Sequence, residues 1–136
     1  TEAATHLMEA SGTTAKDYKW AVFHQPNTKF PQRIAGQLGF SMDQIEPGLL
    51  VPVIGNTYAG AAMIGLTATL DIAQPGDRIL VVSFGSGAGS DAFDITVTDK
   101  VTARQNLATK TREYIARRTE IDYATYVRFR GKLAMK

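Results

Sequence analysis

The chain has 136 residues, of which 44% are hydrophobic and 21% are charged, and it contains no cysteine. This composition is that of an ordinary globular domain. The lack of cysteine excludes disulfides and thiolate metal sites in this chain and is typical of a cytoplasmic protein. No apolar run reaches the roughly 18–20 residues of a membrane span, and no signal peptide is recognisable. The first residue is Thr1 and not Met, which fits a processed or cut polypeptide.

Charge is unevenly distributed along the chain. Residues 1–99 carry five Lys/Arg against ten Asp/Glu, a net charge of −5, and residues 100–136 carry ten against three, a net charge of +7. A basic C-terminal segment can contact phosphates or an acidic partner, and the general alternative is a solvated helical face. We do not expect nucleic-acid binding, because no aromatic stacking platform or known motif accompanies the charge.

Apolar periodicity and turn residues predict alternating helices and strands. In chain order we expect a helix over 2–16, a buried strand over 20–23, and a helix that begins after Asn27 or Thr28 and ends at Gly39. A capping box over 41–44 and an apolar segment over 49–54, broken by Pro52, should follow. The rest of the chain predicts a helix over 57–73, strands over 78–84 and 91–97 that pair with each other, and a basic helix over 101–118. This alternation predicts the α/β class.

The predicted helix over 57–73 has almost no polar face before Asp71. A helix that is apolar all round is buried on all sides, and its many Ala and Gly residues allow neighbours to approach closely. We therefore expect this helix to lie between two layers. Because 136 residues can hardly provide both layers, the sequence predicts that half of the fold lies outside this chain.

His24 follows the predicted strand directly. It could be a core histidine with a satisfied hydrogen bond. Alternatively, since ligands bind at the carboxyl ends of strands in α/β sheets, a neutral imidazole there could polarise a carbonyl or transfer a proton. The only other histidine is His6, on an amphipathic helix, so we expect no metal site.

Lys29 and Arg33 lie four residues apart on the helix after His24 and share one face. With the partial positive charge of the helix N-terminus they suit a phosphate, and a solvated basic face is the alternative. Asn56 stands in the loop before the apolar helix. Its side chain either caps that helix or points into a site.

The segment "FGSGAGS", residues 84–90, is rich in glycine. It lacks the Gly-Lys-Ser/Thr of a phosphate-binding loop and the spacing of a dinucleotide fingerprint, and a strand follows it where both motifs need a helix. A tight turn between strands fits better, with backbone amides and Ser86 able to approach a ligand.

Three segments in a fixed order, "FHQPNTKF", "GNTYAGAAMIGL" and "SFGSGAGSDAF", resemble the C-terminal half of condensing enzymes of the thiolase superfamily. Ketoacyl-acyl-carrier-protein synthase III enzymes carry a similar His-Gln-x-Asn and Gly-Asn-Thr. Lys29, Tyr58 and the "GSG" with Ser86 resemble the 3-hydroxy-3-methylglutaryl-CoA (HMG-CoA) synthase family instead, and the short basic ending resembles its archaeal type. The resemblance covers nearly the whole chain.

The resemblance implies that residues 1–136 form the C-terminal half-domain of an αβαβα layered fold, with 100–136 as a basic extension. It implies condensation of acetyl-CoA with acetoacetyl-CoA in the mevalonate pathway, to give HMG-CoA and CoA. The resemblance implies no cofactor. The substrates that it implies are coenzyme A thioesters.

The resemblance also assigns roles to individual side chains. His24 is implied to bind and polarise the acetoacetyl group as a catalytic residue. Asn56 and Ser86 are implied to bind acyl groups or stabilise oxyanions. Lys29 and Arg33 are implied to hold the phosphates of CoA.

The nucleophilic cysteine and the general-acid glutamate of this family belong to the N-terminal half, so we predict that the isolated chain is inactive. Implied partners are that N-terminal half, further copies in a dimer or larger homo-oligomer, an acetoacetyl-CoA thiolase and a small OB-fold bridging protein. Two alternatives remain: a ketoacyl synthase III-like enzyme acting on a carrier-bound acyl chain, and a non-catalytic acyl-CoA-binding or scaffold subunit.

Overall fold

The computed structural model describes residues 1–87 and 89–132. Within them one sheet is formed by β1 (Trp20–Phe23), β2 (Arg78–Val82) and β3 (Ala92–Thr96), in the order β1-β2-β3. β1 runs parallel to β2, and β3 returns antiparallel to β2. Because β1 and β2 are parallel, their carboxyl ends lie at the same edge of the sheet.

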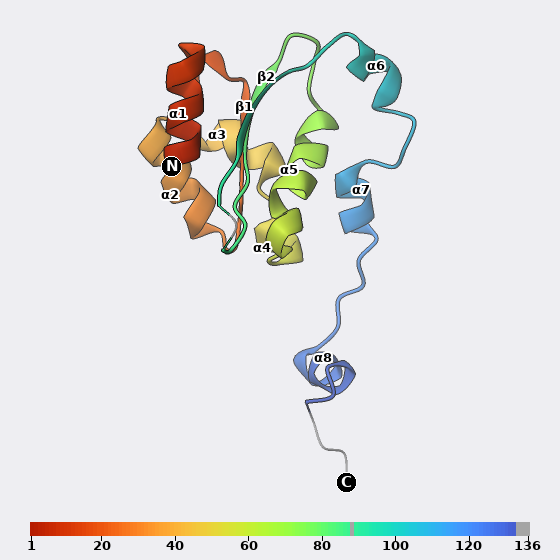
Figure 1. Ribbon diagram of the computed structural model, residues 1–136. Helices are drawn as coiled ribbons and strands as arrows, with labels where there is room; N and C mark the ends of the chain where they lie inside the picture. Colours follow the sequence, from red (N-terminus) through yellow and green to blue (C-terminus); the bar gives the residue numbers. More distant parts are fainter. Residues whose placement is uncertain (88, 133–136) are drawn as a thin grey trace.

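Helices cover both faces of this sheet, with α1 and α2 on one face and α5 on the other (Figure 1). In chain order the α-helices are α1 (Glu2–Ser11), α2 (Lys29–Leu38), α3 (Met42–Ile45), α4 (Val51–Ile54), α5 (Ala61–Leu70), α6 (Lys100–Arg104), α7 (Thr111–Ala116) and α8 (Tyr123–Phe129). None of the described helices is long and apolar enough to cross a membrane.

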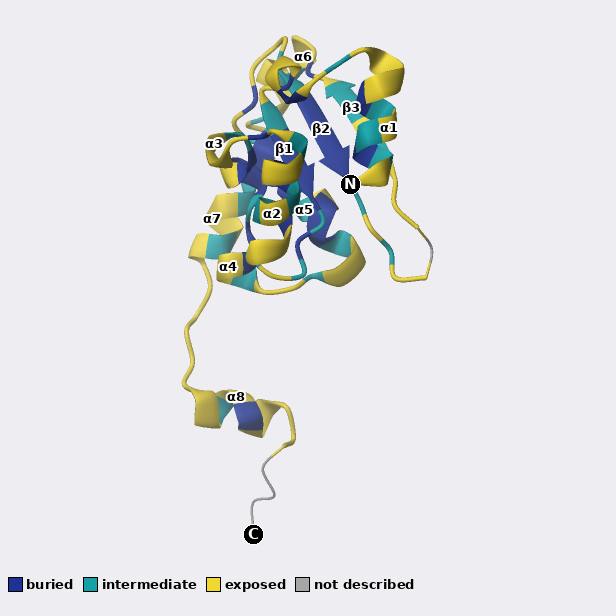
Figure 2. Cartoon of the chain, turned by 90° about the vertical axis from the view of Figure 1, so that its left-hand side faces the viewer, coloured by how far each residue is buried: buried dark blue, intermediate teal, exposed yellow. Residues whose placement is uncertain are grey.

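Alternation along the strands separates the core into two clusters. Ala21 and Phe23 of β1 belong to the cluster with α1 and α2, whereas Val22 belongs to the cluster with α5. In β2, Leu80 joins the first cluster and Ile79 the second. β2 is therefore buried along most of its length, while the edge strand β3 is half-buried or exposed (Figure 2).

The capping residues predicted at both ends of α2 and at the start of α3 are confirmed. The side chain of Asn27 caps the start of α2, because its Oδ1 accepts a 3.0 Å hydrogen bond from the backbone N–H of Phe30. The helix ends at Gly39, whose φ of 86° is left-handed and favours glycine. A capping box opens α3, since the side chains of Ser41 and Gln44 each accept the backbone N–H of the other residue.

Helix α5 approaches the sheet closely because its contact point has no side chain. A Cβ atom added to Gly65 would lie 2.8 Å from a methyl group of Val22 and 2.9 Å from the carbonyl oxygen of Gly48. Gly48 is itself confined by Val22 and Thr69, since a Cβ atom added there would lie 3.1 Å from each of these side chains. Strand β1, α5 and the turn at Gly48 therefore meet at backbone distance.

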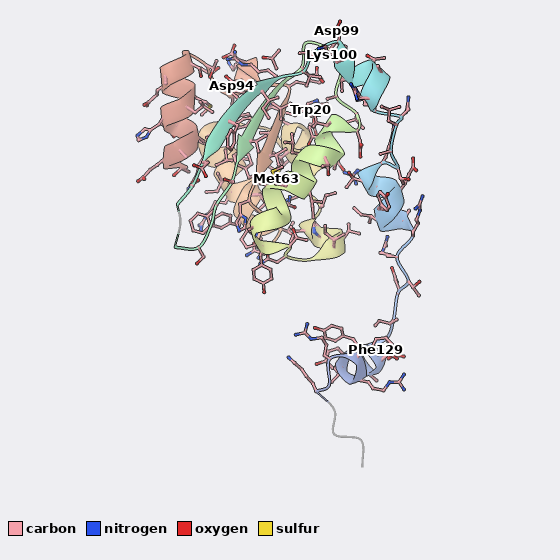
Figure 3. The ribbon with its side chains drawn as sticks, turned by 45° about the vertical axis from the view of Figure 1, so that its right-hand side comes forward. Trp20, Met63, Asp94, Asp99, Lys100 and Phe129 are labelled. Atoms are coloured by element: carbon pink, nitrogen blue, oxygen red, sulfur yellow. The ribbon has the colours of Figure 1, made fainter. Side chains whose placement is uncertain are left out.

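The prediction that this helix is buried on all sides holds for one face only. The buried residues of α5 include Ala61, Ala62 and Gly65. On the other side, Met63 is 61% exposed, and Figure 3 labels it on α5. The predicted range of 57–73 is also too long, because a 3₁₀ turn precedes Ala61. The described residues thus cover only part of an apolar helix.

The prediction of one basic helix over 101–118 is wrong. The segment is divided into α6 and α7 by tertiary contacts with the end of α5. The Gln105 amide donates 2.7 Å hydrogen bonds to the carbonyl oxygens of Leu70 and Ala73. The Asp71 carboxylate accepts the backbone N–H of Thr111 at 2.6 Å. These bonds satisfy groups at the ends of helices and redirect the chain. The first helix is likewise shorter than 2–16, because it ends at Ser11.

We predict that Gly65→Ala destabilises the chain by about 1–3 kcal/mol, because the new methyl group has to displace backbone as well as Val22. Gly36→Ala in α2 is the matched control, since nothing lies within 4 Å of its added Cβ. That change should stabilise by up to about 1 kcal/mol through helix propensity. Urea unfolding followed by circular dichroism measures both. Equal stability of the two variants would contradict the close approach.

Candidate functional site

His24 lies at the edge where β1 and β2 end together. Its backbone N–H donates a 2.9 Å hydrogen bond to the carbonyl oxygen of Val82, which continues the pairing of the two strands by one residue. The imidazole is half-buried and lies beside the ring of Phe84, with 5.7 Å between ring centroids and 49° between planes. The strand pairing thus fixes the backbone position from which the imidazole extends, and the ring of Phe84 covers part of the imidazole.

A cavity of about 270 Å³ opens beside this imidazole. Its wall is mainly apolar, with a few polar groups contributed by His24, two serines and the start of α1. The lining residues are Thr1, Glu2, Ala3, Phe23, His24, Phe30, Ile34, Val82, Ser83, Phe84 and Ser90. An apolar pocket with a few convergent polar groups is the usual form of a small-molecule site.

Burial lowers the pKa of His24 below its ordinary value of 6.5. The imidazole is therefore neutral at pH 7, with one ring nitrogen as donor and the other as acceptor. A neutral imidazole in an apolar cavity can donate a hydrogen bond to a carbonyl oxygen or exchange a proton with a bound group. The cavity and the protonation state together suit chemistry at an uncharged carbonyl.

A second hollow of about 530 Å³ lies along the start of α2 and is lined by Asn27, Lys29, Phe30 and Arg33. Phe30 also lines the His24 cavity, so the two hollows adjoin at this ring. Lys29 and Arg33 are exposed and form no ion pair within the described residues. The structure therefore brings His24, Lys29 and Arg33 to one region, with two cations next to an apolar cavity.

Asn56 and Ser86 do not line the cavity of His24. The Oδ1 of Asn56 accepts the backbone N–H of Tyr58 at 2.7 Å, so this exposed side chain supports a local turn. Ser86 is exposed in the turn that is closed by the bridge between Gly85 and Gly89. Both remain candidates by resemblance, and in this chain alone they lie on open loops.

Gln25 is a residue that the sequence reasoning missed. Its side chain is 4% exposed and all of its polar atoms are satisfied. The amide nitrogen donates to the carbonyl oxygen of Gly48 at 2.7 Å, and the amide oxygen accepts the backbone N–H groups of Leu50 and Val51 at 2.8 Å each. The signal was a polar residue next to His24 at the end of an apolar strand. Ser83, Phe84 and Ser90 carried no comparable signal.

No group of three or more His, Cys, Asp or Glu side chains that could hold a metal ion occurs among residues 1–87 and 89–132.

Residues 8–96 match the model of the family described as 3-oxoacyl-[acyl-carrier-protein (ACP)] synthase III C terminal. This range is more than half of the 136 residues and contains both hollows except for the start of α1. The chain belongs to this family of synthase III C-terminal domains. The three segments that carry the resemblance all lie within this range and thus belong to one type of domain.

Among curated relatives of this synthase III C-terminal domain, the hydroxymethylglutaryl-CoA synthase of Methanocella arvoryzae is 58% identical over 131 residues. That of Methanothermobacter thermautotrophicus is 56% identical over 133 residues. The matches cover 96% and 98% of this chain and 38% of each relative. The chain therefore spans less than two fifths of the length of these archaeal synthases, and it matches their C-terminal part.

Solved structures share the fold at lower identity. MvaS in complex with 3-hydroxy-3-methylglutaryl coenzyme A is similar with a TM-score of 0.75 and 22% identity, over 95% of this chain and 39% of that chain. PksG, an HMG-CoA synthase from Bacillus subtilis, gives a TM-score of 0.73 and 18% identity, over 96% and 37%. The expected thiolase-like α/β fold is confirmed.

We predict that Phe84→Ala moves the pKa of His24 back toward 6.5, because removing the ring exposes the imidazole. Nuclear magnetic resonance titration of the His24 ring protons measures it in both proteins. A wild-type pKa at or above 6.5 would contradict the buried neutral imidazole.

The same shift has a consequence for stability. The folded chain holds this proton less tightly than the unfolded chain does, so the contribution of His24 is fully present above pH 6.5 and is lost as the pH falls below it. The loss of stability on acidification below pH 6.5 should be smaller in Phe84→Ala.

Proposed function

We propose that the chain is the C-terminal, CoA-ester-binding portion of an HMG-CoA synthase that condenses acetyl-CoA with acetoacetyl-CoA to give HMG-CoA and CoA. The observation that carries the proposal is the adjacency of the His24 cavity and the basic hollow at Phe30. A CoA ester has a small acyl group at one end and phosphates at the other, so it needs both kinds of site. The archaeal synthases at 56–58% identity support the same function.

In this proposal the acetoacetyl group of the acceptor lies in the apolar cavity. The neutral imidazole of His24 donates a hydrogen bond to a carbonyl of this group or exchanges a proton with it. Lys29 and Arg33 bind the phosphates, with Arg33 able to form paired hydrogen bonds to one phosphate. The ring of Phe30 separates the two ends of the ligand.

Covalent catalysis has to use a thiolate from another stretch of polypeptide, because this chain contains no cysteine. The proposed sequence is acetyl transfer to that cysteine with release of CoA, carbon–carbon bond formation with acetoacetyl-CoA, and hydrolysis of the enzyme-bound thioester. A glutamate from the same stretch acts as general acid. Asn56 and Ser86 bind acyl groups or oxyanions once their loops are covered by that stretch.

The proposal extends to the setting of the enzyme. It includes assembly into a dimer or larger homo-oligomer, a cytoplasmic location, and association with an acetoacetyl-CoA thiolase through a small OB-fold protein.

A second candidate is condensation on a carrier-bound acyl chain, which is favoured by the family model that matches residues 8–96. The acceptor separates the two functions: acetoacetyl-CoA for the synthase proposed above, malonyl carrier protein for a ketoacyl synthase. A third outcome is that the chain binds CoA esters but gives no turnover when it is mixed with any cysteine-bearing polypeptide. That outcome would instead support a non-catalytic acyl-CoA-binding or scaffold subunit.

We predict no synthase turnover by the chain alone. Turnover should appear when the chain is combined with a polypeptide spanning the part of the Methanocella arvoryzae synthase that precedes its match. In that mixture, His24→Ala should lower kcat by about 10²–10⁴, the usual contribution of a general acid–base group. Loss of acetoacetyl-CoA measures the rate, and intact mass measures acetylation of the cysteine-bearing polypeptide. Turnover by the 136-residue chain without a cysteine would refute the division of roles.

Lys29→Ala and Arg33→Ala should each weaken acetoacetyl-CoA binding about tenfold, or about 1.4 kcal/mol, because each loses a charged contact with phosphate. Lys16→Ala is the matched control, as it removes one exposed cation outside the hollow. Calorimetry or chemical-shift titration gives the affinities. Acetoacetyl-pantetheine, which lacks the nucleotide phosphates, should bind all four proteins equally. Equal losses for Lys16→Ala and Arg33→Ala would indicate a general effect of charge and contradict the assigned site.

A further inference from the structure

The side chain of Gln25 joins three segments of the chain at the carboxyl end of β1. Its amide nitrogen donates a 2.7 Å hydrogen bond to the carbonyl oxygen of Gly48 and a longer one, of 3.4 Å, to that of Ala61. Its amide oxygen accepts the backbone N–H groups of Leu50 and Val51 at 2.8 Å each. One carboxamide thus bonds the turn after α3, the start of α4 and the start of α5.

These partners lie on both sides of the loop formed by residues 55–60. Val51 opens α4, which leads directly into the loop, and Ala61 opens α5, which follows it. Figure 1 shows α4 beside the start of α5, near the carboxyl end of β1. The Gln25 side chain therefore holds both flanks of the loop that contains Asn56.

The loop needs fixed flanks because its backbone is strained. Tyr58 has a φ of 53°, in the left-handed region that residues other than glycine seldom adopt. Such a conformation persists only where the surrounding structure holds it. The Oδ1 of Asn56 accepts the N–H of Tyr58 at 2.7 Å, so the N–H groups of the Asn56 carboxamide are left to donate to a ligand. The direction of these donors depends on the conformation of the loop.

The Gln25 carboxamide can hold the loop firmly because it is buried and fully bonded. Its residue is 4% exposed, and no buried side-chain nitrogen or oxygen among the described residues lacks a partner. Gly65 of α5 leaves the room for it, since a Cβ atom added there would lie 3.1 Å from the amide nitrogen of Gln25. Removing the carboxamide would leave buried backbone groups unsatisfied, which costs more than the bonds contribute. The segment would therefore have to move.

We propose that Gln25 is a positioning residue of the condensation, which holds the imidazole of His24 and the carboxamide of Asn56 in a fixed relation. The inference rests on the proposed function, in which both groups bind the acyl ester. Gln25 does not line the His24 cavity, so it acts through the other two residues. Its backbone continues the strand end that presents His24, and its side chain holds the loop that presents Asn56. Donors that are oriented before the ligand binds are what a developing oxyanion requires.

The first measurement compares Gln25→Met, which removes these hydrogen bonds at similar side-chain length, with the matched control Gln105→Met. The Gln105 amide also donates two hydrogen bonds to backbone carbonyls, but at the opposite end of α5. Nuclear magnetic resonance relaxation of the full 136-residue chain gives the order parameters of the backbone amides of residues 56–60. They should fall from about 0.85 to below about 0.6 in Gln25→Met and stay unchanged in Gln105→Met.

The second measurement is the turnover of each variant mixed with the preceding part of the Methanocella arvoryzae synthase. Gln25→Met should lower kcat about 10–100-fold, because small misplacements of reacting groups are costly. The KM for acetoacetyl-CoA should change less than about threefold, since the cations that bind the phosphates are untouched, and Gln105→Met should keep both constants within about twofold. Circular dichroism shows that each variant is folded. Gln25→Asn, whose amide is one methylene too short to reach every partner, replaces Gln25→Met if that variant does not fold.

Equal order parameters of the loop in Gln25→Met and the wild type would overturn the proposal. A loosened loop with an unchanged kcat would overturn it as well, because the reaction would then not depend on the loop. In both cases turnover by the wild-type mixture would still support the proposed function. Equal losses of kcat in Gln25→Met and Gln105→Met would indicate a general loss of stability and reject the positioning role.

Absence of turnover by the wild-type mixture would reject the proposed function itself, and with it the part of Gln25 in the reaction. The order parameters would still show whether the carboxamide holds the loop, so the two failures are distinguishable.

Discussion

The carboxamide of Gln25 is the interaction on which the arrangement of the site depends. The segment after α3 runs beside the core without strand or long helix, so its buried backbone groups need partners. Gln25 supplies them for Gly48, Leu50 and Val51 with three hydrogen bonds of 2.7–2.8 Å. Because Gln25 follows His24 directly, the residue that anchors this segment also fixes the end of the strand that presents the imidazole.

That anchor acts together with close backbone packing. Gly65 of α5 meets both Gly48 and Val22, so α5, the turn and β1 are held at a distance that no side chain would permit. A helix positioned this closely on the sheet leaves its other face, with Met63, facing outward. Met63 is apolar and 61% exposed, so this face is suited to contact with further protein. The same packing that builds the site therefore leaves an apolar side chain open on the far face of α5.

Much of this architecture is readable from the sequence where local chemistry decides it. The Asn27 cap, one of the two that the sequence allowed, and the left-handed Gly39 depend on neighbours within four residues and were predicted. The strand over 20–23 was predicted from its apolar run, although its pairing with β2 is long-range. The break between α6 and α7 was not, because it depends on Gln105 reaching the end of α5, 32 and 35 residues away.

The same division applies to the site. His24 and the pair Lys29 and Arg33 follow from the end of a strand and the first turns of the next helix, so their proximity could be predicted. The burial of Gln25, the packing of Phe84 on the imidazole and the sharing of Phe30 by two hollows join segments far apart in the chain. Such contacts cannot be predicted from a pattern of single residues along the sequence. For Asn56 and Ser86 the sequence gives the residue type alone, and their exposed loops need a second surface to become a site.

In the proposed function, binding and chemistry are divided between this chain and another stretch of polypeptide. The groups of this chain are suited to hold an acyl group and phosphates, and such uniform binding does not by itself lower a reaction barrier. In the proposed reaction the barrier falls when a thiolate is placed against the bound ester, since orientation of the reactants supplies a large share of catalysis.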